Sequence, residues 1–359
     1  MLIFLIVVVG LSLLILGHEA GHFFAAKYFK LKVDEFGFGF PPRIFARKKG
    51  ETEYSVNWLP FGGFVKIAGE NDPAPFVESG IENSKEGEKE KTNKESEAGR
   101  NGLFYAQLAW KRSMIILSGV GMNFIIGWLL TSLVFMIGVP GALVISNVQS
   151  NSPAAEAGVQ VGDIVQGYTT APSFIEFVNQ NRGQEIQLEI LRGSEKVTIR
   201  AEPRSVTSPG EGALGVELAE AGIPRHSPLK ALLVGLRQSF VVSWSIVVAL
   251  YYLVISLITQ GMLVEGIVGP VGIFSIAHQA GQIGVVYLLG LLAIISLNLA
   301  VVNLLPFPAL DGGRFFLIFI EKIKGSPLSR KIEAAINAVG FAFLILLMVL
   351  LTIRDIVNL

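Results

Sequence analysis

Stretches of apolar residues alternate along the chain with shorter polar and charged stretches. A helix needs about 20 apolar residues to cross the roughly 30 Å hydrocarbon core of a bilayer. Stretches of that kind occupy residues 1–28, 113–139, 285–305 and 334–354, and a further uncharged stretch occupies residues 240–258. The pattern therefore predicts a polytopic α-helical membrane protein.

Residues 36–67 follow a different pattern, with many glycines and two β-like runs separated by a Lys-Gly-Glu turn. This pattern predicts a β-hairpin. Its apolar side chains suit an element that re-enters the membrane, where non-helical backbone must be buried in protein or face water. An amphipathic hairpin on the cytoplasmic side fits the residues as well, and the sequence leaves both readings open.

Two segments have the composition of extramembrane chain. Residues 70–100 are rich in Glu, Lys, Ser, Asn and Gly, and they cannot bury enough apolar surface to fold alone, so we expect a disordered insertion. Residues 141–205 contain SPAAEAGV followed by GDIV (152–159 and 162–165), which resembles a PDZ domain. Its strands and helix are expected at residues 142–145, 174–181, 186–190 and 196–199. PDZ domains bind extended peptides at a sheet edge, but a domain that only spaces or gates fits equally.

Composition agrees with a membrane protein and restricts the chemistry. Of the 359 residues, 51% are hydrophobic and 16% are charged, and the mean hydropathy is +0.56. The formal net charge is zero and no basic patch indicates a nucleic-acid partner. The chain has no cysteine, so disulfides and thiolate metal ligands are excluded. Any metal would have to be held by histidines and carboxylates.

Basic residues predict the orientation of the chain. Lysines and arginines cluster between residues 27 and 49, directly after the first apolar stretch, and again between residues 322 and 331. The positive-inside rule places both clusters on the cytoplasmic side. The N terminus and the PDZ-like domain are then expected to be extracytoplasmic.

The first apolar stretch carries the polar motif His18-Glu19-Ala20-Gly21-His22. On a helix, residues four apart project from one face, so both imidazoles could bind one zinc ion. Glu19 could then act as a base toward a water activated by the metal. Ionisable residues are costly within a bilayer and usually mark function there, although a chance match to this short motif is the alternative.

A zinc protease site needs a third protein ligand, and Asp311 is the best placed acid. No other carboxylate lies between Glu265 and Glu321, and Asp311 follows two prolines that break a helix. To reach an ion near the inner end of the first span, residues 285–305 must run inward. Residues 240–258 must then cross an even number of times, most simply none, and either lie along the outer interface or pack on the bundle without crossing. Four spans are therefore predicted; the rival is a five-span protein in which Asp311 is no ligand.

Several motifs occur in one order along nearly the whole chain. These are HEAGH, SGVGMNF (118–124), one PDZ-like domain, GPVGI (269–273) and NLAVVNLLPFPALDGG (298–313). Together they resemble the bacterial site-2 proteases of peptidase family M50, zinc intramembrane metalloproteases of the regulator of sigma-E type. Two departures are visible: Val120 stands where the family usually has proline, and only one PDZ-like domain is present.

The resemblance implies that His18, His22 and Asp311 bind Zn²⁺ and that Glu19 is the catalytic base. Substrate-binding roles are implied for Asn303, Pro306, Pro308 and Asn298, and the hairpin is implied to pair with the substrate. The implied activity is that of a metalloendopeptidase in the bacterial cytoplasmic (inner) membrane. It would cleave the transmembrane segment of single-span proteins, either anti-sigma factors or remnant signal peptides, in regulated intramembrane proteolysis.

Two other functions stay open, a catalytically silent membrane scaffold bearing a PDZ domain and a polytopic transporter. The complete ligand set argues against the first, and the lack of visible internal repeats argues against the second. His226 and His278 lack ligand spacing and are expected at the surface or at an interface. Asn123, within the second span, needs a hydrogen-bond partner, which could be a neighbouring helix or the metal site.

The predicted fold is a polytopic α-helical membrane protein with four transmembrane helices, a membrane-associated β-hairpin and one extracytoplasmic PDZ-like α+β domain. The expected segments are a first transmembrane helix (1–28), the re-entrant β element (29–69), the insertion (70–100), a second transmembrane helix (113–139), the PDZ-like domain (141–205), a region with an interfacial helix (226–284), a third transmembrane helix with its proline motif (285–313), a cytoplasmic connection (314–333) and a fourth transmembrane helix (334–354).

Overall fold

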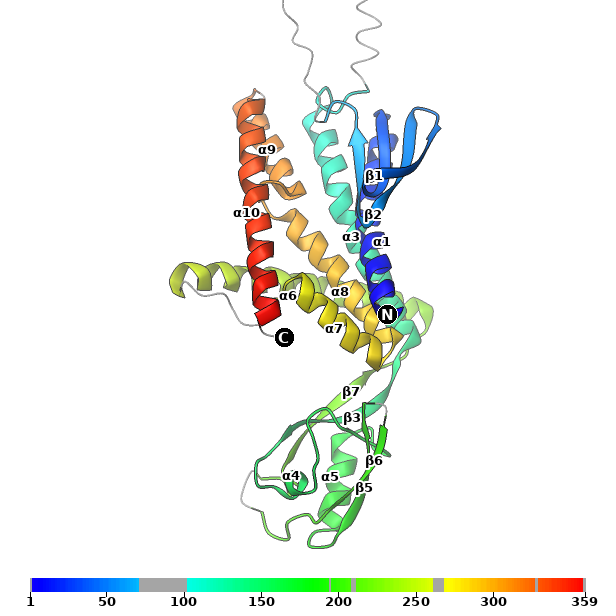
Figure 1. The fold of residues 1–359 in the computed structure, drawn as a ribbon, viewed down its shortest axis with the longest axis vertical. Helices are drawn as coiled ribbons and strands as arrows, with labels where there is room; N and C mark the ends of the chain where they lie inside the picture. Colours follow the sequence, from blue (N-terminus) through cyan, green and yellow to red (C-terminus); the bar gives the residue numbers. More distant parts are fainter. Residues whose placement is uncertain are drawn as a thin grey trace, which may run out of the picture. The chain divides into compact units, whose positions relative to one another are not determined.

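The computed structural model describes residues 2–70, 102–193, 195–207, 211–260, 268–326 and 329–357. The chain forms a helical unit, Met1–Thr131 with Gly235–Leu359, and a sheet unit, Ser132–Val234 (Figure 1). Apart from Glu70, the predicted insertion at 70–100 lies outside the described residues.

In its described part, the helical unit is built from five long apolar helices and two shorter ones. Their bounds are α1 (Leu2–Tyr28), α3 (Ala109–Ile137), α6 (Pro228–Gln260), α7 (Pro270–Ile283), α8 (Val285–Leu304), α9 (Asp311–Lys324) and α10 (Arg330–Val357). Among the described residues, five of these helices, α1, α3, α6, α8 and α10, are long and apolar enough to cross a membrane. The predicted class, a multi-pass membrane protein with a sheet domain, is confirmed.

The number of membrane crossings stays a prediction, because five helices qualify by length and composition where four crossings were expected. In Figure 1, α1 and α8 run in one direction and α3 and α10 in the opposite direction, whereas α6 lies across α8 and α10. This arrangement brings the C-terminal end of α1 and the C-terminal end of α8 to the same end of the helical unit.

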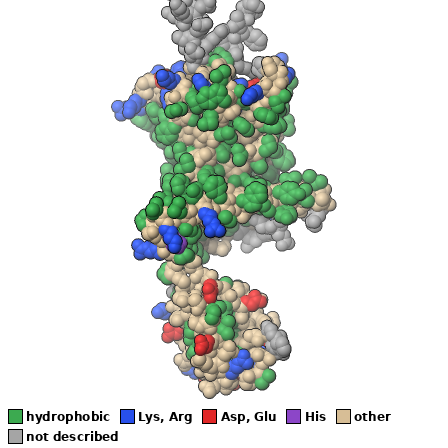
Figure 2. All heavy atoms as spheres, turned by 180° about the vertical axis from the view of Figure 1, so that it is seen from behind, with side chains coloured by type: hydrophobic (Ala, Val, Ile, Leu, Met, Phe, Trp, Pro, Cys, Tyr) green, Lys and Arg blue, Asp and Glu red, His purple; other side chains and the backbone are tan. Residues whose placement is uncertain are grey.

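The surface of the helical unit suits a lipid environment. Figure 2 shows a broad band of hydrophobic side chains over it, with Lys and Arg side chains gathered at its upper end. Large apolar side chains such as Trp244, Val339 and Phe341 are exposed there. Water would make such a surface unfavourable, because burying apolar area is the main driving force for folding and association.

Close packing of α1, α3 and α8 holds the centre of the unit. A Cβ atom at Gly127 of α3 would meet the side chain of Leu297 in α8, so the absent side chain lets the two helices approach. The Ser296 hydroxyl of α8 donates a hydrogen bond to the carbonyl oxygen of Asn123 in α3, 2.8 Å away. Helix α7, which was not predicted as a separate helix, packs Ala277 against Val7 of α1.

Strands β1 (Val33–Lys49) and β2 (Thr52–Ile67) form the antiparallel hairpin that the sequence predicts at residues 36–67. Both strands bend, so residues 33–38 pair on one side with residues 63–67 and on the other side with residues 53–56. Residues 63–67 consequently form one edge of the folded hairpin. Ile67 and Val33 are buried in a cluster with Ile115 of α3, which anchors this edge to the helices.

The sheet unit contains one antiparallel sheet of five strands in the order β6-β5-β4-β3-β7. Its elements are β3 (Val139–Val148), α4 (Pro153–Glu156), β4 (Ile164–Val165), α5 (Ala171–Gln180), β5 (Ile186–Arg192), β6 (Glu195–Ala201) and β7 (Val216–Ile223). Leu143, Phe174 and Ile190 are buried in its core. The identification of this unit as a PDZ-like domain stays a prediction.

The predicted end of the sheet domain at residue 205 is wrong, because β7 continues the sheet and pairs with β3. Strand β7 has the sequence VELAEAGI, in which small and acidic residues stand between few large apolar ones. Its place beside β3 comes from long-range pairing that its own weak pattern does not indicate. The predicted cytoplasmic connection at residues 314–333 contains most of α9, which runs from Asp311 to Lys324, and its place relative to the membrane stays a prediction.

Candidate metal centre

Helix α1 presents two histidine side chains one turn apart on the same face. The Nε2 atoms of His18 and His22 lie 3.3 Å from one another. Both rings are largely shielded, with side-chain exposures of 12% for His18 and 11% for His22. The four-residue spacing of the motif therefore produces the convergence that the sequence predicts.

Asp311 comes to these rings from the opposite half of the chain. Helix α8 ends at Leu304, and Leu305 adopts an extended conformation, as expected for a residue before proline. Residues 305–310 then turn the chain so that Asp311 becomes the first residue of α9. Close backbone approach requires the next two residues to be glycine, because a Cβ atom at Gly312 or Gly313 would overlap carbonyl oxygens of residues 304–307.

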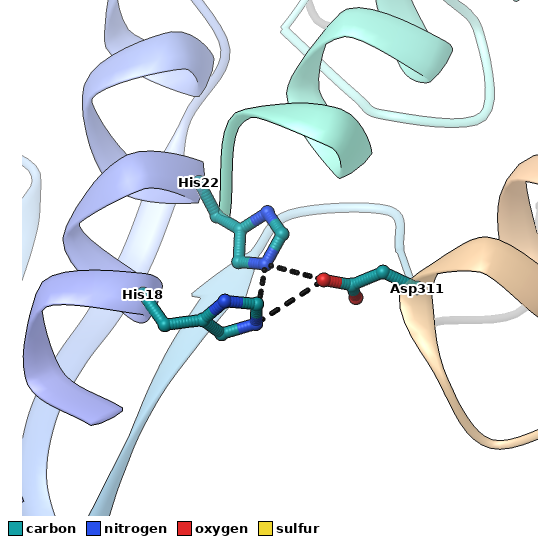
Figure 3. A group of neighbouring side chains, drawn as sticks. All are labelled: His18, His22 and Asp311. Atoms are coloured by element: carbon teal, nitrogen blue, oxygen red, sulfur yellow. Dashed lines mark hydrogen bonds and ion pairs between the residues drawn. The ribbon is translucent and has the colours of Figure 1, made fainter. Parts of the chain in front are cut away.

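The three side chains point toward one another (Figure 3). The Oδ2 atom of Asp311 lies 3.1 Å from Nε2 of His18 and 3.3 Å from Nε2 of His22. The Asp311 side chain is 16% exposed. Four-coordinate zinc with bonds of about 2.0–2.1 Å places neighbouring ligand atoms about 3.3 Å apart. The spacing of these three atoms and their chemistry therefore fit a zinc ion that keeps a fourth position open.

The second nitrogen of each imidazole is held by helix α3. Nδ1 of His22 lies 2.8 Å from the carbonyl oxygen of Ile115, which can only accept, so Nδ1 carries the proton and Nε2 is free to bind a metal. Nδ1 of His18 lies 3.2 Å from the side-chain nitrogen of Asn123. Asn123 is fully buried, and its Oδ1 atom has no hydrogen-bond partner among the described residues.

The unpaired Oδ1 atom of Asn123 indicates which form of the site this side chain suits. When Nε2 of a neutral histidine binds a metal, its Nδ1 carries the proton and must donate it to an acceptor. Half a rotation of the Asn123 amide would bring Oδ1 to the position that Nδ2 holds, where it would accept from Nδ1 of His18. Asn123 thus suits the metal-bound form of the site. Of the two partners considered for Asn123, the metal site is the one its side chain contacts.

We expect Asn123→Ala to weaken zinc binding about 10- to 100-fold, the usual cost of losing a hydrogen-bond partner of a metal-ligating histidine. Asn123→Asp keeps an acceptor of similar size and should bind zinc close to the wild-type affinity. Competition with a chromophoric chelator measures both affinities. Equal affinities for the wild type and the alanine variant would show that the Asn123 contact does not support the site.

Gly119 lets α3 pass directly beside the two imidazoles. A Cβ atom there would lie 2.3 Å from Nε2 of His22 and 2.8 Å from Cε1 of His18. Any side chain at this position would occupy the space in which the rings converge. The motif SGVGMNF contains this glycine, but only the folded position of α3 shows that its lack of a side chain serves the site.

Glu19 turns toward the hairpin. Its Oε2 atom accepts a hydrogen bond of 3.1 Å from the backbone N–H of Val65 in β2. Val65 belongs to residues 63–67, the edge of the folded hairpin, so this N–H points out of the sheet and toward α1. Gly63 on the same edge lies near the Glu19 side chain, since its Cβ position would be 3.6 Å from Cγ of Glu19.

The other four predicted site residues lie on α8 and in the loop that follows it. Asn298 is an exposed residue of α8, and Asn303 is half-buried in its last turn. Pro306 is exposed, whereas Pro308 lies against Gly340 of α10. Their substrate-binding roles stay predictions.

Sequence reasoning missed the groups that act through their backbone. These are the carbonyl of Ile115 and the N–H of Val65, and no side chain at either position could have signalled such a contact. The two remaining histidines lie elsewhere, as expected. His226 stacks on Phe135, and His278 contacts Gln282 on an exposed face of α7.

Comparison with known proteins agrees with this geometry. The model of peptidase family M50 matches residues 6–347. The zinc metalloprotease RasP of Bacillus licheniformis is 32% identical, with 96% of each chain covered. The regulator of sigma-W protease RasP of Bacillus subtilis is 30% identical, over 96% of this chain and 95% of the relative. The zinc metalloprotease RasP of Oceanobacillus iheyensis is 29% identical, over 94% and 95% respectively.

Proposed function

This chain belongs to peptidase family M50 and is a zinc metalloendopeptidase of the membrane, and from that premise we propose that it cuts transmembrane segments of single-span proteins. His18, His22 and Asp311 hold the zinc ion in this proposal, and Glu19 is the catalytic base. The observation that carries it is the convergence of two imidazole nitrogens and one carboxylate oxygen within 3.3 Å of one another.

Zinc, when bound, polarises a carbonyl group and lowers the pKa of water toward 7. Glu19 supplies the proton transfers that hydrolysis needs. One of its carboxylate oxygens is held by the N–H of Val65, which leaves the other free to take a proton from the attacking water. The same group then gives that proton to the leaving amine. The hydrogen bond to Val65 keeps the carboxylate aimed while the proton moves.

The position of the hairpin edge supports the proposal that the substrate binds as an unwound, extended segment. Carbonyl groups of a helix are engaged in hydrogen bonds to residues four positions on, so a helical segment must unwind before attack. Residues 63–67 lie at the edge of the folded hairpin and beside Glu19, where an extended peptide could add as a further strand. We therefore assign the binding of the scissile strand to this edge. Asn303, Pro306, Pro308 and Asn298 remain proposed contributors, and Asn298, which lies furthest from Asp311 along the chain, is the weakest candidate.

The name of the Bacillus subtilis relative, regulator of sigma-W protease, supports a substrate that controls a sigma factor. An anti-sigma factor with a single span, or a remnant signal peptide, fits the site. In the proposed topology, the N terminus and the sheet unit are extracytoplasmic, and the cationic ends of α1 and α9 lie on the cytoplasmic side of the bacterial inner membrane. The sheet unit would bind a peptide terminus or exclude large ectodomains in the manner of a PDZ domain.

Cleavage in proteoliposomes tests this function. Purified protein is reconstituted with a single-span model substrate, and the cut bond is located by mass spectrometry. The proposal expects a cut within the transmembrane segment, abolished by chelation and restored by zinc. Cuts confined to the soluble part of the substrate would contradict it.

The same assay tests the hairpin edge through Val65→Pro. Proline removes the outward N–H and with it the hydrogen bond to Glu19, and its ring disturbs the edge at which a substrate strand would add. We expect cleavage to fall by about 10²-fold or more, since positioned proton transfer is worth that much, while zinc content stays unchanged. Val65→Ala keeps the N–H and should cleave near the wild-type rate. Normal cleavage by the proline variant would remove the hairpin edge from the mechanism.

A further inference from the structure

Helix α9 turns one face toward the N-terminal half of the chain, and Asp311 begins that face. Residues three, four, seven and ten positions after Asp311 lie above one another on a helix of 3.6 residues per turn. Those residues are Arg314, Phe315, Ile318 and Glu321. Each of them contacts a residue from the N-terminal part of the chain or packs on a cluster of such residues, none of which lies beyond Ile116.

Ion pairs hold this face near both ends. Near its start, Arg314 pairs with Glu70, which follows β2. In its last part, Glu321 pairs with Arg112 of α3 at 3.0 Å, and the two side chains are only 15% and 19% exposed. Screening by water is weaker at such shielded positions than at an open surface, so these charges contribute more than an exposed pair would.

Apolar packing holds the middle of this face of α9. Ile318 is 7% exposed and belongs to a buried cluster with Ala26 of α1, Ile67 of β2 and Ile115 of α3. Phe315, one turn earlier, packs against the same cluster. The opposite face of α9 is free of these contacts, since Phe316, Phe319 and Ile323 are exposed.

These contacts determine where Asp311 lies relative to the two histidines. The loop at residues 305–310 ties Asp311 to α8 and, through the bond between Ala309 N–H and Asn337 Oδ1, to α10. The two histidines, however, lie on α1. The contacts of this face of α9 fix the position of Asp311 relative to α1, α3 and β2. These are the elements that carry and surround the imidazoles.

We propose that Arg112 with Glu321, and Arg314 with Glu70, are positioning residues that set the place of Asp311 against His18 and His22. The inference rests on the proposed role of Asp311 as a zinc ligand and adds how that ligand is held. None of the four residues belongs to the proposed ligand set or to the hairpin edge proposed to bind substrate. Their effect passes through the axis of α9, so loosening either end shifts the carboxylate at its start.

Charge reversal and exchange test the proposal in the full-length protein. Arg112→Glu and Glu321→Arg each place like charges together, and each should lower the affinity for zinc about tenfold, in the range found for groups that orient metal ligands. The double variant Arg112→Glu with Glu321→Arg restores opposite charges and should return to within about threefold of the wild-type affinity. Lys324→Glu, an exposed charge reversal on the last turn of α9, serves as the matched control and should bind zinc normally.

Kinetics supply a second readout. In the single-span cleavage assay, a misplaced ligand should lower kcat while leaving KM unchanged, because substrate binding is assigned to the hairpin edge and not to α9. General destabilisation would not produce rescue by charge exchange together with an unchanged KM. Arg112→Gln and Arg314→Gln remove the ion pairs without creating repulsion and cover the case in which a reversal variant fails to fold.

Unchanged zinc affinity in folded Arg112→Gln and Arg314→Gln would overturn the proposal, as would a double variant no better than either reversal alone. The failure of the proposed function looks different. A wild-type protein that binds zinc but cleaves no transmembrane segment would refute the function, and it would leave the zinc affinities of the α9 variants to decide the positioning role.

Discussion

Replacing Glu19 by glutamine should lower cleavage by about 10²- to 10⁴-fold while zinc content stays at the wild-type level. An amide cannot take a proton from the attacking water. Its oxygen can still accept the hydrogen bond that the Val65 N–H donates to the carboxylate, so the local structure should persist. Zinc per chain is measured by elemental analysis and cleavage is measured in proteoliposomes on the same preparations.

Glu176→Gln on helix α5 of the sheet unit is the matched control, because Glu176 is an exposed carboxylate in the other unit. It should cleave normally. Wild-type cleavage by Glu19→Gln would mean that another group is the base. A wild-type protein as inactive as Glu19→Gln would favour the scaffold or the transporter over the protease.

Removing either half of the metal site should abolish zinc binding. Asp311→Ala leaves two histidines on one helix turn, and His22→Ala leaves one histidine and one carboxylate. Losing a direct ligand should cost more than the 10- to 100-fold that loss of a supporting hydrogen bond costs, so zinc should be lost on dialysis and cleavage with it. Elemental analysis after dialysis against a weak chelator provides the measurement.

His278→Ala is the control for these variants, since His278 lies on an exposed face of α7 away from the cluster. It should retain zinc and activity. Retention of one zinc ion per chain by Asp311→Ala would mean that the carboxylate is not a ligand, although it lies 3.1 Å from His18.

The sequence could predict those parts of the site that depend only on neighbouring residues. The spacing of His18 and His22 places both on one helix face through helix geometry alone. Asp311 is separated from them by nearly the whole chain, and it could be singled out only because acids are scarce between residues 265 and 321 and prolines precede it. Asn123 could not be assigned to the site, because a buried amide needs a partner without indicating which one.

The remaining features depend on tertiary contacts that no short pattern carries. The long apolar runs predicted the long helices of the helical unit, since membrane thickness sets the length of a spanning helix. Strand β7 has too few large apolar residues to be recognised, and it joins the sheet only by pairing with β3. The role of Gly119 depends on which helix passes beside it, and α9 owes its docked face to ion pairs with Glu70 and Arg112.

The central claim is that one zinc ion is bound jointly by α1 and by the start of α9. Asp311→Cys tests it most directly, because the natural chain contains no cysteine and a thiolate ligand is distinct in zinc X-ray absorption. The account predicts nitrogen or oxygen neighbours alone in the wild type, and one sulfur at about 2.3 Å in the zinc-loaded variant. A zinc-loaded Asp311→Cys protein whose spectrum shows no sulfur neighbour would contradict it.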